Sequence, residues 1–193
     1  MAVNQVRNIA PFINDVFTVT SKWWTYRDGV LHRGLDIATS GSKPVYSMLN
    51  GYVVDKGYTS TAGNYIIIAD NTQGSSTYGY ATRYLHLANL PPFPIGTRLM
   101  ILQQVAMEGS TGESTGIHLH VEMQDISRFN WQWHTSNNQS DYLDPTVFMG
   151  IDNVEGTQWI YEGVVPPPTP TESTKSKFKW VLYANKLRNK EVN

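Results

Sequence analysis

The segment HLH, at His118 to His120, places two histidines on either side of one leucine. In a β-strand both imidazoles face one side of the strand and Leu119 faces the other. Same-face neighbours lie roughly 6.5 to 7 Å apart along the backbone, so both rings can reach one pocket. One ring can then bind a metal ion while the other handles a proton or stabilises an oxyanion. The alternative interpretation is a half-exposed strand of polar residues.

A second pattern, HRGLD, brings an imidazole and a carboxylate close together in the sequence at His32 and Asp36. Both groups are good ligands for Zn²⁺. In a fully extended strand they would lie about 13 Å apart, so the chain must bend to bring them to one ion. Gly34, between them, is where such a bend costs least. Taken alone, the pattern fits a surface His–Asp pair equally well.

Together the two patterns supply two histidines and one carboxylate for a single metal ion: His32, Asp36 and either His118 or His120. Three protein ligands leave the fourth tetrahedral position of a zinc ion to water, which is the arrangement of a catalytic site. Zinc lowers the pKa of that water toward ~7, and a neighbouring free histidine can act as its general base. The chain has no cysteine, so a metal ion must be held by His, Asp or Glu.

The composition is that of an ordinary globular protein, and its charge indicates neither a nucleic-acid nor a membrane partner. The 193 residues are 40% hydrophobic and 16% charged, with a formal net charge of −1. No run approaches the ~20 apolar residues of a transmembrane helix. The N-terminal segment lacks the pattern of a signal peptide, so we expect any export to use another route.

Short apolar segments separated by turn residues predict an all-β fold. The 11 Tyr, 6 Trp and 15 Gly favour β-structure over a helical bundle. The segment 98–109, RLMILQQVAMEG, fits a helix or two short strands by periodicity, and its glycine boundaries and strand-rich surroundings favour strands. The other predicted strands lie in KPVYSML, GYVVDKGY, NYIIIAD, YGYATRYLHL and IHLHVEMQ.

Five segments, taken in order, resemble the lysostaphin-type (LytM-like) zinc metalloendopeptidases, which cut the peptide part of bacterial peptidoglycan. The resemblance runs over residues 18–149. It implies an all-β domain with a folded antiparallel, sandwich-like sheet and one zinc ion in a groove. The segments that carry it are HRGLDIA, KPVYSMLNGYVV, RYLHLANL, EGSTGESTGIHLHVEM and LDPTVFM.

The same resemblance implies a role for each of five residues. It makes His32, Asp36 and His120 the zinc ligands. It gives His118 and His86 the tasks of activating water and stabilising the tetrahedral intermediate. His86, in the segment YLHL, is indicated by the resemblance alone and not by spacing.

A few residues depart from the family pattern. Trp23 and Trp24 stand where the family usually has Phe-Gly before the first motif, and Ile117 replaces the usual proline before HLH. We expect the two tryptophans to line the groove and to alter which peptides fit. His134 matches no family position and is expected in a loop.

The expected organisation is a leader segment at 1–17, a LytM-like peptidase domain at 18–163, a Pro/Thr/Ser-rich linker at 164–177 and a basic-aromatic tail at 178–193. The tail is either a frayed end or a segment that docks a partner or the cell surface. The resemblance implies peptidoglycan peptides as the substrate and action at the bacterial cell wall, outside the cell or on a virion. Two alternatives stay open: a zinc carboxypeptidase acting on D-amino acids, and a catalytically silent wall-binding module.

Overall fold

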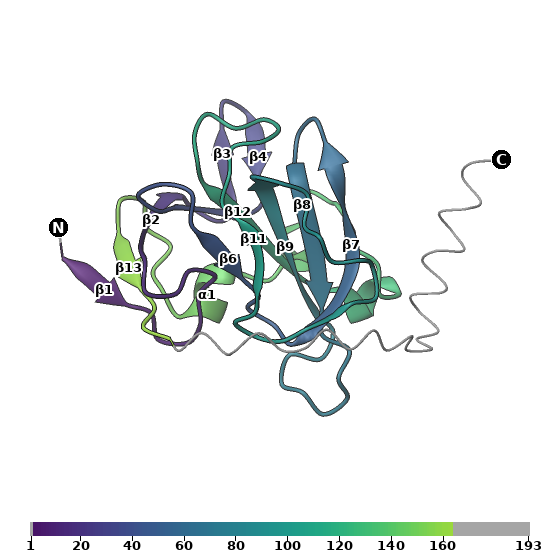
Figure 1. Cartoon of the computed structure of the whole chain (residues 1–193). Helices are drawn as coiled ribbons and strands as arrows, with labels where there is room; N and C mark the ends of the chain where they lie inside the picture. The colour runs from purple at the N-terminus through teal and green to yellow at the C-terminus, as the bar shows by residue number, and fades with distance from the viewer. Residues whose placement is uncertain (1, 164–193) are drawn as a thin grey trace.

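The structure, a computed structural model, describes residues 2–163 and shows an all-β protein with very little helix (Figure 1). This confirms the fold class predicted from the sequence. The predicted linker at 164–177 and tail at 178–193 lie outside the described residues. The strands are β1 (Val3–Gln5), β2 (Val16–Ser21), β3 (Thr25–Arg27), β4 (Val30–His32), β5 (Leu35–Ala38), β6 (Pro44–Tyr46), β7 (Gly51–Thr59), β8 (Gly63–Ala69), β9 (Tyr80–Leu87), β10 (Arg98–Leu99), β11 (Gln104–Met107), β12 (Leu119–Asp125) and β13 (Gln158–Ile160).

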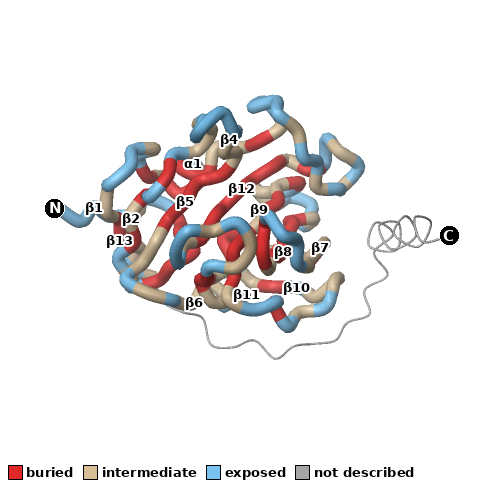
Figure 2. Tube along the Cα trace, turned by 90° about the horizontal axis from the view of Figure 1, so that it is seen from above, coloured by how far each residue is buried: buried red, intermediate tan, exposed pale blue. Residues whose placement is uncertain are grey.

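Nine of these strands form one sheet in the order β1-β13-β2-β5-β12-β9-β8-β7-β10. All neighbours in this sheet are antiparallel except β1 and β13, which run parallel. A β3–β4 hairpin and a β6–β11 pair form two separate small sheets. The order brings β5 and β12, which are far apart in the sequence, side by side in the middle of the sheet (Figure 2).

Side-chain alternation separates an apolar core from a polar face of the sheet. In β5, Leu35 and Ile37 are fully buried in the main core, and Asp36 between them faces the other side. Strand β12 repeats the pattern, with Leu119 and Val121 in the core on either side of a histidine. The residues of these central strands are mostly buried (Figure 2), and the strands still present polar side chains on one face.

The N-terminal residues 2–17 pack on the same sheet as the rest of the protein. Strand β1 pairs with β13, near the end of the described chain. Phe12 and Phe17 are fully buried in the main core, with their ring centroids 5.9 Å apart. The expected boundary at residue 18 thus falls inside strand β2, and β1 on one side of it pairs with β13 on the other.

Two further segments take the structure that their sequence favours. The ambiguous segment 98–109 contains strands β10 and β11 and no helix, which confirms the preference for strands. LDPTVFM contains helix α1 (Pro145–Met149), which begins after the capping residue Asp144 and is capped at its end by Gly150.

The only other helical segments within 2–163 are the 3₁₀ turns η1 (Ile126–Phe129) and η2 (Gln139–Asp141). Over these residues no helix combines the length and the apolar character needed to cross a membrane.

Phe12→Ala tests whether the N-terminal segment belongs to the folded core. We expect it to lower the free energy of unfolding by about 3–5 kcal/mol, because it leaves a cavity beside Phe17. Urea denaturation followed by tryptophan fluorescence measures this. Val3→Ala is the control, since Val3 is 45% exposed and should change stability little. Equal stability of the two variants would show that the segment is dispensable for the fold.

Candidate metal centre and groove

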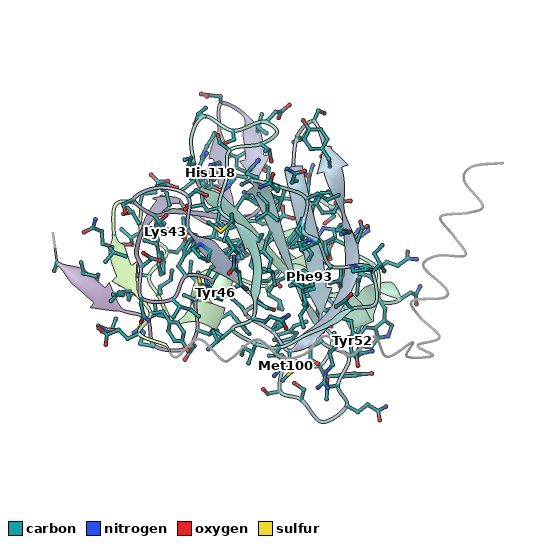
Figure 3. The ribbon with its side chains drawn as sticks, in the orientation of Figure 1. Lys43, Tyr46, Tyr52, Phe93, Met100 and His118 are labelled. Atoms are coloured by element: carbon teal, nitrogen blue, oxygen red, sulfur yellow. The ribbon has the colours of Figure 1, made fainter. Side chains whose placement is uncertain are left out.

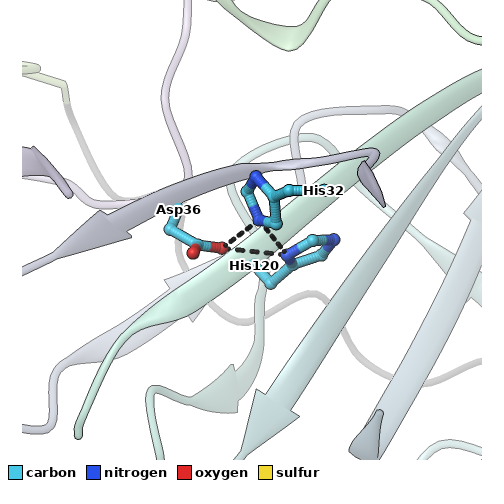
Figure 4. A group of neighbouring side chains, drawn as sticks. All are labelled: His32, Asp36 and His120. Atoms are coloured by element: carbon cyan, nitrogen blue, oxygen red, sulfur yellow. Dashed lines mark hydrogen bonds and ion pairs between the residues drawn. The ribbon is translucent and has the colours of Figure 1, made fainter. Parts of the chain in front are cut away.

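His32, Asp36 and His120 meet at one point on the polar face of the sheet (Figure 4). His32 ends β4, and Asp36 lies in β5, which begins after a bend at Gly34. His120 stands directly beside Asp36 in the antiparallel β5–β12 pair. The two sequence patterns are thus joined by strand pairing, and the expected bend is present.

The three side chains present one lone-pair atom each to a common point. His32 Nε2 lies 3.0 Å from Asp36 Oδ1 and 3.0 Å from His120 Nδ1, and the latter two atoms are 2.9 Å apart. Ligands on a tetrahedral zinc ion, with bonds of about 2.0 to 2.1 Å, lie roughly 3.3 Å from one another. This donor set therefore fits a divalent ion of the zinc type, and it is the one such group found within residues 2–163.

The two histidines of this group are held by hydrogen bonds on their far nitrogens. His32 Nδ1 donates to the Lys22 carbonyl at 3.0 Å. His120 Nε2 donates to Glu122 Oε1 at 3.3 Å. Carbonyl and carboxylate oxygens only accept hydrogen bonds, so these contacts place the ring protons on the far side. In the neutral rings the lone pairs of His32 Nε2 and His120 Nδ1 are thereby left for a metal ion. Without the ion, a proton at this point takes part in the hydrogen bonds to Asp36 Oδ1.

Hydrogen bonding outweighs burial in setting the charges of this site. Burial alone raises the pKa of Asp36, but hydrogen bonds from His120 and His32 hold that pKa well below its usual range. Arg27 Nη2 donates to the other carboxylate oxygen, Oδ2, at 2.9 Å. Burial lowers the pKa of His120, but hydrogen bonds to Asp36 and Glu122 raise it to about 9. A metal ion that binds here competes with a proton on His120, so its binding weakens as pH falls.

Two further histidines lie beside this point. His118 Nε2 is 3.8 Å from Asp36 Oδ1, and the ring centroids of His86 and His118 are 4.7 Å apart. His118 Nδ1 donates to the Gly116 carbonyl at 2.9 Å, and His86 Nδ1 donates to the Thr111 carbonyl at 2.8 Å. In their neutral forms both rings therefore keep Nε2 unprotonated and able to accept a proton.

His86 reaches the groove because β9 is irregular. In a regular strand His86 would face the core together with Tyr84, which is fully buried there. The register between β8 and β9 shifts at this level, and His86 has the left-handed φ of +60°. Such a bulge re-aims a side chain, and here it turns His86 to the groove. No local pattern in the sequence signals this bulge, so spacing could not identify His86.

The five predicted residues line one groove of about 490 Å³. Figure 3 shows His118 at the end of the molecule that carries the β3–β4 hairpin, with Tyr52 and Met100 at the opposite end. Apart from Asp36, the sequence patterns indicated no role for the charged residues of this groove. The sequence could have identified Glu122 as a groove residue, since it lies two residues after His120 and therefore on the same face of β12. The charged residues in the lining are Arg27, Arg33, Arg83, Glu113 and Glu122, besides Asp36.

The expectation that the two tryptophans line the groove is wrong for the groove that the described residues form. Trp23 packs against the main core, and the ring of Trp24 lies 5.3 Å from that of Tyr142. Apolar packing, available to both rings nearby, keeps them away from the polar groove. His134 also lies outside the lining, and its ring stacks on Phe129 at 5.0 Å between centroids.

Gly34 has a second role that the sequence did not reveal. A β-carbon built at this position would overlap the imidazole of His120. Gly34 is not among the residues with positive φ, so close approach of the ring is what requires glycine here.

Comparison with known proteins agrees with this geometry. Residues 30–139, more than half of the chain, match the sequence model of Peptidase family M23. Peptidoglycan DD-endopeptidase ShyB of Vibrio cholerae is 39% identical over 94 residues, which are 49% of this chain and 20% of ShyB. The chain spans about a fifth of the length of the curated relatives it matches.

Two solved structures share the fold. A zinc-containing peptidase from Vibrio cholerae is 30% identical, with a TM-score of 0.54 over 76% of this chain and 41% of the other. The catalytic domain of lysostaphin from Staphylococcus simulans is 23% identical, with a TM-score of 0.53 over 71% of this chain and 92% of the other. With the family match over residues 30–139 and a candidate metal-ligand set inside that range, this chain belongs to peptidase family M23.

Proposed function

We propose that this chain is a zinc-dependent endopeptidase that hydrolyses peptide bonds in the cross-links or stem peptides of bacterial peptidoglycan. The observation that carries the proposal is the convergence of His32, Asp36 and His120, whose ligand atoms lie 2.9 to 3.0 Å apart. The substrate class follows from the relative ShyB, named a peptidoglycan DD-endopeptidase. The site of action is then the bacterial cell wall, outside the cell or on a virion.

His32 Nε2, Asp36 Oδ1 and His120 Nδ1 would hold the zinc ion. Zinc at such a site polarises a carbonyl and makes a water molecule acidic near neutral pH. The protein fixes the three ligand atoms before substrate arrives, because each side chain is also bonded on its far side. Arg27 donates to Oδ2 of Asp36 at 2.9 Å, which orients the carboxylate and leaves Oδ1 directed at the point where the ion would bind.

His118 is the general base in this proposal. Its Nδ1 proton is committed to the Gly116 carbonyl, so Nε2 accepts the proton that the attacking water gives up. His86 supports the tetrahedral oxyanion next to it. In the substrate-free protein the single proton of neutral His86 is on Nδ1, toward Thr111. The negative charge of an adjacent oxyanion would favour a second proton, taken from solvent, on Nε2, which could then donate to that oxyanion.

Digestion of purified peptidoglycan tests the proposed reaction. We expect mass spectrometry to find severed cross-links or stem peptides after incubation with the zinc-loaded protein, and none after incubation with His118→Ala. Release of single terminal residues would instead indicate a carboxypeptidase that acts on D-amino acids. Intact peptidoglycan with a zinc-loaded wild-type protein would favour a silent wall-binding module.

The roles of the two histidines in HLH can be separated by substitution. His118→Ala should keep its zinc content and lose activity by about 10²- to 10⁴-fold, the usual contribution of a general base. His120→Ala should lose zinc, because it removes one of three ligand atoms. Zinc is measured by elemental analysis after dialysis, and hydrolysis by release of peptide fragments. Equal zinc retention in both variants would refute the assignment.

His86 should stay neutral in mildly acidic solution. Burial lowers its pKa to about 4, and the hydrogen bond to Thr111 offsets only part of this shift. An unfolded chain protonates near pH 6.5, so His86 favours the folded state above that pH, and this contribution is lost as pH falls toward 4.

Ring ¹⁵N shifts measured from pH 4 to 8 report the charge of His86 directly. Between pH 7 and pH 5 the wild-type protein should lose roughly 2 kcal/mol more unfolding free energy than His86→Gln. A titration midpoint for His86 near 6.5 would contradict this prediction.

A further inference from the structure

We propose that Glu122 is a positioning residue, held by Arg83, that fixes the His120 imidazole in its metal-binding orientation. The inference rests on the proposed role of His120 as a ligand. Glu122 is almost fully buried, with 5% of its surface exposed, and it lies two residues after His120 on the same strand. A carboxylate in such a place requires partners that offset the cost of its burial.

The four groove histidines differ in what holds their far nitrogen. His32, His86 and His118 each donate to a backbone carbonyl. His120 donates to a side-chain carboxylate, that of Glu122. A carboxylate acceptor raises the electron density on the ligating nitrogen more than a neutral carbonyl does. It also makes the orientation of His120 depend on a second side chain.

The two oxygens of Glu122 have different partners, which fixes the plane of the carboxylate. Oε1 accepts from His120 Nε2 at 3.3 Å, and Oε2 accepts from Arg83 Nη1 at 3.2 Å. Glu122 and Arg83 stand opposite each other in the β12–β9 pair, so strand register maintains this contact.

Arg83 is itself held by aromatic rings. Its guanidinium carbon lies 5.2 Å from the ring centroid of Tyr65 and 5.8 Å from that of Trp133. Its positive charge offsets the charge of the buried Glu122. The chain of contacts therefore runs from the aromatic rings through Arg83 and Glu122 to His120, and on to the point where the three ligands meet.

The ring of His120 has little freedom to move within this frame. The backbone of Gly34 lies against the imidazole and leaves no space for a β-carbon. The Nδ1 edge faces His32 and Asp36, and the Nε2 edge faces Glu122. Removal of the Glu122 charge therefore weakens both the hold on the orientation of the ring and the preference for a proton on Nε2, which ligation through Nδ1 requires.

The test compares zinc affinity in Glu122→Gln and in the wild-type protein by competition with a chromophoric chelator. We expect the substitution to weaken zinc binding by about 10- to 100-fold. Glu113→Gln is the matched control, because Glu113 lines the same groove and its side chain makes no hydrogen bond to any of the four groove histidines. It should bind zinc like the wild-type protein. Equal affinity in all three proteins would overturn the inference.

A second measurement needs no variant and covers the case in which Glu122→Gln does not fold. In the zinc-loaded wild-type protein the Nε2–H proton of His120 should exchange slowly with water, because Glu122 accepts it. Exchange as fast as that of a free imidazole, seen by NMR, would overturn the inference. A wild-type protein that binds no zinc at all would instead overturn the proposed function.

Discussion

Three atoms that all carry lone pairs stand within 3.0 Å of one another, and the arrangement of the surrounding strands holds them there. A carboxylate oxygen and two imidazole nitrogens at this spacing require positive charge between them, either a proton or a metal ion. The bend at Gly34 brings His32 back to Asp36, and the β5–β12 pairing adds His120. Each of these two features alone would leave one ligand out of reach.

The two faces of the sheet carry different kinds of side chain, and both help to hold these three atoms in place. Leu35, Ile37 and their neighbours form the apolar core on one face, which fixes the position of each strand. The other face then carries charged groups in pairs, Arg27 with Asp36 and Arg83 with Glu122. Because each of these two buried acids has a basic partner, its charge is stabilised away from water. The candidate ligand atoms on this face can then stay directed at one point.

Side chains of the same type have different chemical properties in the groove because their surroundings differ. His120 has its pKa raised to about 9 by two carboxylates, whereas burial lowers that of His86 to about 4. The hydrogen bond on the far nitrogen selects which ring nitrogen faces the groove. Imidazole chemistry in this protein is thus assigned by the acceptors around each ring, and not by the residue type.

The sequence by itself determined the strands, the ligand types and the common face of His118 and His120, because all three follow from local composition and alternation. Spacing left open which of these two histidines meets Asp36. In the tertiary structure His120 Nδ1 lies 2.9 Å from Asp36 Oδ1 and His118 Nε2 lies 3.8 Å from it. The bulge at His86 and the pairing of Glu122 with Arg83 were likewise decided by strand register. Register depends on how two strands distant in the chain pair, and the pattern within one strand tells which face a residue takes but not which residue lies opposite it.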